Sequence, residues 1–275
     1  MLKAWGAAYQ QLADILIGAE EGLYQQKETA KGGWRGARAF TLVEKVEESR
    51  EVVSFYFAPV DGQPVLVAEP GQYIGLQLVI DGAEQRRNYS LSTLGDGRLY
   101  RISVKREADG KVSNYLHDQL KVGDSINLFP PAGDFTLAAS DKPLVLISGG
   151  VGITPTLAML EAALASGRQI HFIHCARNGG VHAFREHVDG LAARNPQLKR
   201  FYCYDEDDGV SLPADALGYL DQAQLERWLP QERDLDAYFL GPKPFMAAVK
   251  RHLEALGVPQ GQSRYEFFGP ASALE

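Results

Sequence analysis

Three patterns of hydrophobic and polar positions follow one another along the 275 residues of this chain. The first covers residues 2–26, where large apolar side chains recur at three- and four-residue spacing and predict an amphipathic helix. Gly32 and Gly33 end that pattern. Because so large an apolar face is rarely left in water, this helix predicts either self-association of the protein or a packing partner that is absent.

The second pattern runs from Trp34 to about residue 139 and consists of short runs of β-branched and aromatic residues. Turn signals such as Asp61-Gly62 and Pro70-Gly71 separate these runs. Short strands at this spacing predict an antiparallel β-barrel. A single helix is expected at 112–119, and strands are expected at 40–43, 52–57, 73–80, 100–105 and 125–129.

The third pattern begins after Lys142-Pro143, where residues 144–147 form a continuous apolar run typical of a strand buried on both faces. Strands and helices then alternate, which predicts a doubly wound parallel sheet. The further strands are expected at 169–174, 200–204 and 237–240, and the helices at 156–166, 182–194 and 244–256. We therefore expect an N-terminal helix and linker (1–33), a β-barrel domain (34–140) and an α/β domain (141–275).

Composition narrows the function class. The net charge of −7 argues against a nucleic-acid binder. Neither a signal segment nor a membrane-spanning apolar run occurs in the sequence, so a cytoplasmic protein without membrane contact is expected. Cys175 and Cys203 are too few for an iron–sulfur cluster or a disulfide framework and are expected to be buried apolar side chains. The histidines have no metal-ligand spacing, so no metal site is expected.

The stretch from Gly149 to Pro155 joins an apolar strand to a helix. Glycines let backbone amides approach a pyrophosphate, and the helix N-terminus adds partial positive charge. The turn differs from the G-x-G-x-x-G fingerprint, and a tight turn that binds nothing is the alternative. The candidate cofactor-binding residues here are Gly150, Val151, Gly152, Ile153, Thr154 and Pro155.

The run Arg87-Asn88-Tyr89-Ser90 offers a cation, an aromatic ring and a hydroxyl in four consecutive residues. Strand alternation places Arg87 and Tyr89 on one face. Arg87 suits a diphosphate, Tyr89 suits stacking on a flavin ring, and Ser90 suits a hydrogen bond near the reactive nitrogen of that ring. The alternative is a half-exposed strand with a solvated arginine.

The motifs occur in an order that resembles the ferredoxin–NADP reductase superfamily, and most closely the reductase portion of flavohaemoglobins, the nitric oxide dioxygenases. The resemblance covers nearly the whole chain. Residues 4–9, 13–17 and 32–34 are similar to the last globin helix and its linker, so the chain is expected to be a fragment or a haemless homologue. The remaining segments that carry the resemblance are 70–73, 87–90, 104–107, 110–117, 131–135, 149–155, 181–185, 241–242 and 265–270.

The resemblance implies FAD and either NADH or NADPH as cofactors, with haem only in a full-length relative. It assigns contacts with the nicotinamide dinucleotide to residues 150–155. Phe268 is implied to cover the flavin face where the nicotinamide enters, and Glu266 to tune the flavin potential or the electron exit route; core packing is the alternative for Phe267 and Phe268. Catalytic roles are implied for Tyr89, Ser90, Glu266 and Phe268. Further contacts with the cofactors are implied for Tyr73, Arg87, Asn88, Val112, Ser113, Phe267, Gly269 and Pro270.

Two positions affect the expected nicotinamide chemistry. Leu240 stands where the family commonly has a cysteine before Gly241-Pro242. Arg177 lies in the region where NADPH-binding relatives place a cation for the 2′-phosphate, although a solvated loop arginine is an equal alternative. The choice between NADH and NADPH is therefore open at this point.

The implied activity is an FAD-containing NAD(P)H oxidoreductase that passes electrons to a globin haem domain or a small redox protein. In isolation it is expected to reduce artificial acceptors. The alternatives are a stand-alone reductase for ferredoxin, flavodoxin or an oxygenase, and a non-catalytic nucleotide-binding module.

Overall fold

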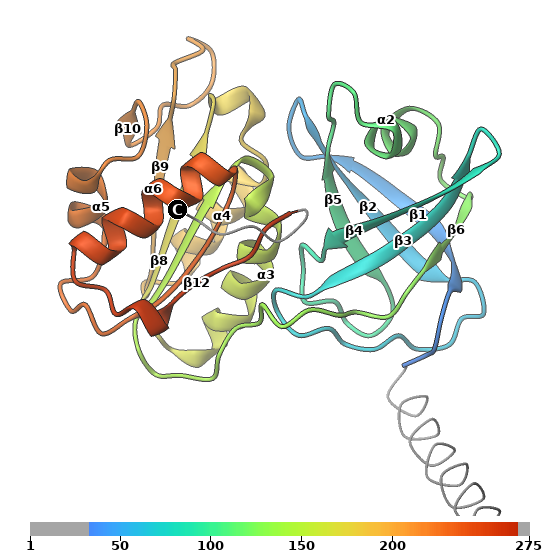
Figure 1. Ribbon diagram of the computed structural model, residues 1–275, viewed down its shortest axis with the longest axis horizontal. Coiled ribbons are helices and arrows are strands. Elements are labelled where there is room, and N and C mark those ends of the chain that lie inside the picture. Colours follow the sequence, from blue (N-terminus) through green and yellow to red (C-terminus); the bar gives the residue numbers. More distant parts are fainter. Residues whose placement is uncertain (1–32, 269–275) are drawn as a thin grey trace, which may run out of the picture.

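The computed structural model describes residues 33–268 and shows two six-stranded sheets side by side (Figure 1). Residues 1–32 and 269–275 lie outside the described part. The helix expected at 2–26, the self-association inferred from it, and the candidate residues Gly269 and Pro270 therefore lie outside the described residues as well. Within the described part, no helix is long and apolar enough to cross a membrane.

The first sheet is antiparallel, as expected, with the order β4-β3-β6-β1-β2-β5. Alternate side chains such as Phe40, Phe55 and Leu76 face inward and are fully buried. A bridge between Leu91 and Ile102 joins the chain just after β4 to β5 at the opposite edge. The elements are β1 (Arg38–Glu47), β2 (Val52–Pro59), β3 (Tyr73–Ile80), β4 (Ala83–Ser90), β5 (Tyr100–Lys105), α2 (Lys111–Asp118) and β6 (Ser125–Leu128).

The second sheet is parallel, as expected, with the order β10-β9-β8-β7-β11-β12. The chain order reverses between β7 and β11, which is where ligands bind in such sheets. Its strands are β7 (Leu144–Gly149), β8 (Ile170–Ala176), β9 (Leu198–Tyr204), β10 (Ala216–Leu217), β11 (Asp236–Leu240) and β12 (Ser263–Tyr265).

Helices cover both faces of the parallel sheet. Apolar side chains of α3 and α4 pack in one buried cluster and those of α5 and α6 in another. The helices are α3 (Ile153–Ala163), α4 (Arg185–Arg194), α5 (Gln222–Trp228) and α6 (Lys243–Ala255), with short 3-10 turns η1 (Gly150–Gly152), η2 (Leu164–Ser166), η3 (Gly179–Val181) and η4 (Gln260–Gln262).

The structure corrects several expected element bounds. Helix α4 begins at Arg185 rather than at residue 182, because Phe184 before it has a left-handed backbone (φ 63°). Helix α3 begins at Ile153, three residues before the expected start. Helix α5 was not expected; a capping box starts it, in which the Asp221 carboxylate accepts a hydrogen bond from the Gln224 amide.

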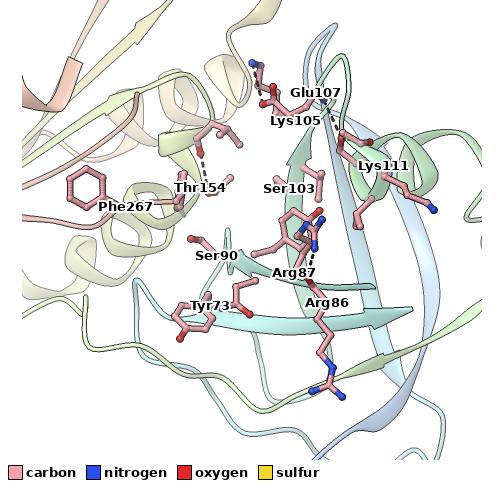
Figure 2. Close-up of a pocket in the computed structure, with 18 of the residues that line it drawn as sticks. Tyr73, Arg86, Arg87, Ser90, Ser103, Lys105, Glu107, Lys111, Thr154 and Phe267 are labelled. Atoms are coloured by element: carbon pink, nitrogen blue, oxygen red, sulfur yellow. Dashed lines mark hydrogen bonds and ion pairs between the residues drawn. The ribbon is translucent and has the colours of Figure 1, made fainter. Parts of the chain in front are cut away.

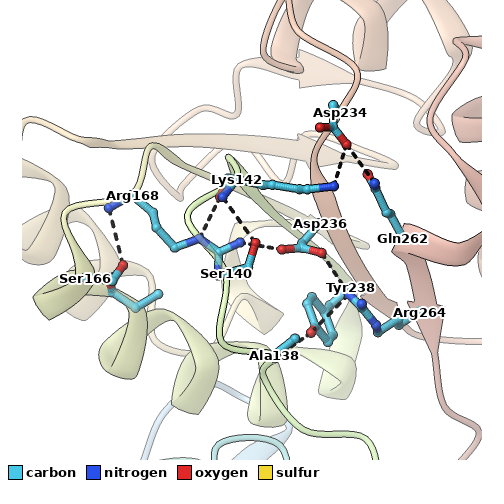
Figure 3. Close-up of polar contacts among 11 residues, drawn as sticks. Ala138, Ser140, Lys142, Ser166, Arg168, Asp234, Asp236, Tyr238, Gln262 and Arg264 are labelled. Carbon is cyan, nitrogen blue, oxygen red and sulfur yellow. Dashed lines mark hydrogen bonds and ion pairs between the residues drawn. The ribbon is translucent and has the colours of Figure 1, made fainter.

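A polar network fastens β12 and the segment between the sheets to β11 (Figure 3). Asp236 pairs with Arg168 at 2.7 Å and with Arg264 at 3.0 Å. Arg264 also donates to the Tyr238 hydroxyl, which accepts a second hydrogen bond from the Ala138 amide at 2.8 Å. Asp236 therefore joins three segments that are distant in sequence.

Direct contacts also join the two sheets. Val52, at the start of β2, is buried in the core of the parallel sheet. The Arg50 amide donates to the Gly180 carbonyl at 3.1 Å, and the Thr93 hydroxyl donates to Glu161 of α3 at 2.9 Å. These contacts fix the cleft between the sheets.

Candidate active site between the two sheets

A cavity of about 980 Å³ lies between the two sheets (Figure 2). Strands β3 to β5 and the first turn of α2 line one side, while the η1–α3 turn and the segment after β12 line the other. Of the candidate residues, it brings together Tyr73, Arg87, Asn88, Tyr89, Ser90, Val112, Ser113, Val151, Thr154, Glu266, Phe267 and Phe268.

Strand β4 supplies the run Arg87 to Ser90. Tyr73 of β3 lies opposite Ser90 in the register, so both line the same stretch of the cavity. Tyr89 packs against the core of the first sheet, and burial raises the pKa of its phenol to about 12 although the Arg87 charge opposes the shift. Arg87 is exposed, and its guanidinium donates to the Arg86 carbonyl at 2.7 Å. The strand thus presents a protonated phenol, a hydroxyl and a cation.

The first turn of α2 faces the same cavity. Its N-cap is Gly110, whose backbone accepts a hydrogen bond from the Ser113 hydroxyl at 3.1 Å. A Cβ on Gly110 would lie 2.3 Å from the Ser113 Oγ and 2.9 Å from the Glu107 Cβ, so a larger residue would displace this turn. Within residues 33–268, no side chain caps the helix at Gly110. Its first amides and its dipole are therefore suited to an anionic group.

The segment after β12 closes the other side. Tyr265 packs against Phe239 and Phe267, with ring centroids 5.3 and 5.8 Å away. Phe267 joins the core of the parallel sheet, whereas Phe268 is 50% exposed. Burial, together with the charge of Asp134, raises the pKa of the Glu266 carboxyl. Phe267 thus packs against the core and also lines the cavity, and Phe268 presents a half-exposed ring to it.

The glycine-rich turn after β7 connects this cavity to a second one of about 590 Å³. Val151 lines both cavities, and Gly150 lines the second. A Cβ on Gly152 would lie 2.5 Å from the Leu240 carbonyl oxygen, so only glycine permits this approach of the turn to β11. Ile153 and Pro155 are buried in α3 and line neither cavity, so their contact with the dinucleotide stays a prediction.

The second cavity reaches from that turn to the carboxyl ends of β8 and β9. Cys175 and Arg177 line it at β8, and Asp205 lines it at β9. Partial burial and the neighbouring Glu206 raise the pKa of Asp205, while Arg177 opposes that shift. Both cysteines are buried, as expected. Leu240 is fully buried and lines neither cavity.

The sequence did not identify several of the residues that line the two cavities. Ser103 and Lys105 lie on the same face of β5. The sequence shows that they alternate along a strand, but it does not show which face of that strand lines the cavity. Asp205 directly follows β9, a position typical of ligand-binding groups in parallel sheets. Further lining residues that were missed include Arg86, Glu107, Asp109, Gly110 and Lys111 in the first cavity and Glu51, Tyr219 and Phe245 in the second.

Comparison with known proteins decides the family. The model for an oxidoreductase FAD-binding domain matches residues 39–137, and the model for an oxidoreductase NAD-binding domain matches residues 146–251. A flavohaemoprotein of Pseudomonas putida is 76% identical over 275 residues, covering 100% of this chain and 70% of its own length. The chain belongs to the flavohaemoprotein family. A flavohaemoprotein of Pseudomonas aeruginosa is 63% identical over the same coverage.

Solved structures of flavohaemoproteins agree with this assignment. The flavohaem-like FAD/NAD-binding domain of a nitric oxide dioxygenase from Vibrio cholerae matches with a TM-score of 0.79 and 38% identity, covering 86% of this chain and all of that one. A flavohaemoglobin from Malassezia yamatoensis with bound FAD and haem matches with a TM-score of 0.77 and 28% identity, covering 97% of this chain and 68% of that one. The resemblance to the reductase portion is confirmed, and the chain is an FAD-dependent NAD(P)H oxidoreductase of the flavohaemoprotein type.

Proposed function

We propose that this flavohaemoprotein reductase holds FAD in the first cavity and the nicotinamide dinucleotide in the second, and that its electrons leave for a haem. The cleft between the sheets carries this proposal, because Val151 of the glycine-rich turn lines both cavities. Two domains follow from it, an FAD-binding domain at 34–140 and an NAD(P)-binding domain at 141–275, preceded by a linker region at 1–33.

The first cavity suits FAD in charge and in shape. Arg87 and the first turn of α2 at Val112 and Ser113 provide a cation and a helix N-terminus for the diphosphate. Tyr73 and Tyr89 provide flat apolar surfaces for the flavin ring. A residue with a Cβ does not fit at Gly110, which keeps the backbone accessible at this turn.

When bound here, FAD would supply the chemistry that takes a hydride, with its two electrons, from the nicotinamide and passes the electrons on singly. The chain contributes orientation and shielding. Tyr89 is protonated at neutral pH, as an ordinary tyrosine is, and its raised pKa extends this to more alkaline pH, so its hydroxyl remains a hydrogen-bond donor. Ser90, which is buried, positions a second hydroxyl, and Asn88 adds a polar side chain beside it. Phe268, which is half-exposed at the cavity, would cover the ring face and would move aside when the nicotinamide enters.

The proposed acceptor is a haem held by a globin domain or by a separate redox protein. The Malassezia relative contains both FAD and haem, and the Vibrio relative is a nitric oxide dioxygenase. This chain spans 70% of the length of the Pseudomonas putida flavohaemoprotein. We therefore assign to it the electron supply for nitric oxide dioxygenation, with artificial acceptors replacing the haem when the chain is studied alone.

An anaerobic visible spectrum of the purified, FAD-reconstituted protein tests the proposal. We expect an oxidised flavin spectrum that bleaches on addition of NADH or NADPH, followed by reoxidation with a one-electron dye. Free FAD at the same concentration is the control. A protein that retains no FAD, or that bleaches no faster than free FAD, would contradict the proposal.

A further inference from the structure

We propose that Glu51, a residue of the antiparallel sheet's first hairpin, makes the protein prefer NADH over NADPH by occupying Arg177 in the nicotinamide cavity. This inference rests on the proposed function and specifies the substrate of the same site. It gives a specificity role to a residue outside the parallel sheet.

Arg177 has the position of a residue that contacts the adenosine ribose. It follows β8, the strand next to β7 and its glycine-rich turn. In dinucleotide-binding sheets, the group that meets this ribose comes about 20 residues after the glycine turn: a carboxylate accepts the 2′-hydroxyl of NAD, and an arginine accommodates the 2′-phosphate of NADP. Arg177 and Asp205 both line the second cavity, so both kinds of group are present there.

Glu51 holds this arginine in an ion pair. Its Oε1 lies 2.5 Å from the Arg177 guanidinium nitrogen Nη2, and its Oε2 lies 4.0 Å from the Lys105 Nζ. Glu51, Lys105 and Arg177 all line the second cavity. Lys105 is also paired with Glu107, at 3.4 Å (Figure 2). Both cations on this wall of the cavity therefore already have carboxylate partners.

The hairpin that carries Glu51 is fixed on the parallel sheet. On one side of Glu51, the Arg50 amide donates to the Gly180 carbonyl at 3.1 Å. On the other side, Val52 is 4% exposed and is buried in the core of the parallel sheet. Because both neighbours are anchored, the backbone of Glu51 is held where its side chain reaches Arg177.

The arrangement favours an uncharged ribose. A 2′-phosphate carries close to two negative charges at neutral pH and would have to displace Glu51 from Arg177, or share the guanidinium with it, in the neighbourhood of Asp205 and Glu206. The 2′-hydroxyl of NADH carries no charge and can donate to the Asp205 carboxylate. The carboxylates of Glu51, Asp205 and Glu206 therefore disfavour NADPH, and the Asp205 carboxylate also favours NADH.

The test compares kcat/KM for NADPH and NADH in the FAD-loaded protein, with a one-electron dye as acceptor. We expect the unchanged protein to prefer NADH. Glu51→Gln should raise the NADPH-to-NADH ratio about tenfold or more, mainly through a lower KM for NADPH, because Arg177 becomes available. Glu47→Gln is the matched control, since it removes the same charge from an exposed position of the same hairpin and should leave the ratio unchanged.

The double variant with Glu51→Gln and Arg177→Ala should return the ratio toward that of the unchanged protein. A ratio that stays high in the double variant, or an unchanged protein that prefers NADPH, would overturn the inference. So would equal ratios in Glu51→Gln and Glu47→Gln. Calorimetric binding of NAD⁺ and NADP⁺ measures the same preference without electron transfer. Retained NAD⁺ preference in a protein that fails to turn over would contradict the proposed function but support the role of Glu51.

Discussion

Strand β4 places two exposed cations at the proposed FAD site, Arg86, which pairs with Glu84, and Arg87. Replacing Arg87 with alanine removes a charge-assisted hydrogen bond to the diphosphate, which is worth about 1.5–3 kcal/mol. We therefore expect Arg87→Ala to raise the Kd for FAD about tenfold or more, measured by flavin fluorescence during titration of the apoprotein.

Arg98→Ala is the control for Arg87. Arg98 is also exposed, and it pairs with Asp96 in a turn outside both cavities. This variant should bind FAD like the unchanged protein. Equal FAD affinities of the two variants would show that Arg87 has no contact with the cofactor.

The sequence alone pointed to residues whose chemistry is concentrated in one short run. Arg87, Tyr89 and Ser90 are almost adjacent in one strand, so their proximity follows from the sequence alone, and alternation places Arg87 and Tyr89 on one face. Glu51 and Arg177 are 126 residues apart, and nothing local marks either of them as a partner of the other. Their contact exists only because two sheets meet, which no local pattern encodes.

Among the elements, the η1–α3 turn is sharply limited by backbone geometry. A Cβ at Gly152 would lie 2.5 Å from the Leu240 carbonyl oxygen, and real Cβ atoms do not approach backbone so closely. Gly152→Ala should push α3 away from β11, raise the KM for the nicotinamide and destabilise the fold by about 1–3 kcal/mol. Steady-state kinetics and thermal unfolding measure both effects.

Gly261→Ala is the matched control for this turn, because a Cβ there meets nothing within 4 Å. It should leave both the KM and the unfolding temperature nearly unchanged. If Gly152→Ala behaved like this control, the close approach of the turn to β11 would not be required.

Element prediction succeeded where a pattern is long. The apolar run of β7 and the spacing in α6 were recognised because each repeats over several residues. Helix α5 has seven residues and β12 has three, which is too short for a period to emerge. Strand β12 exists because it pairs with β11 and because Arg264 reaches Asp236, and both of these partners lie far back in the chain.

At the scale of the whole molecule, Asp236 holds separate parts of the chain together (Figure 3). The side chains of Asp236 and Arg168 are only 5% and 4% exposed. Asp236→Asn leaves Arg168 buried beside a neutral group, so we expect a loss of about 3–5 kcal/mol in the free energy of unfolding, measured by urea denaturation. Asp234→Asn, which affects an exposed pair with Lys142, should cost much less.

The pH dependence of this loss has a definite sign. Burial raises the pKa of Asp236, but hydrogen bonds from Ser140 and Arg264 and the charges of both arginines outweigh it and leave the pKa lowered. Its stabilising contribution is therefore complete above the pKa of an unfolded aspartate, about 3.9, and is lost as pH falls. The difference in the free energy of unfolding between the unchanged protein and Asp236→Asn should therefore become smaller as pH falls into that acidic range. A difference independent of pH would rule out an ionised Asp236.

The position of Glu266 to Phe268 has a consequence for biosynthesis. These residues close a cavity whose opposite wall, residues 73–113, is translated much earlier. The antiparallel sheet can form on the ribosome, but the cavity remains open on one side until β12 pairs with β11. Stable retention of the flavin should therefore follow synthesis of β12, and nascent chains halted before Ser263 should exchange the cofactor freely with the surrounding pool.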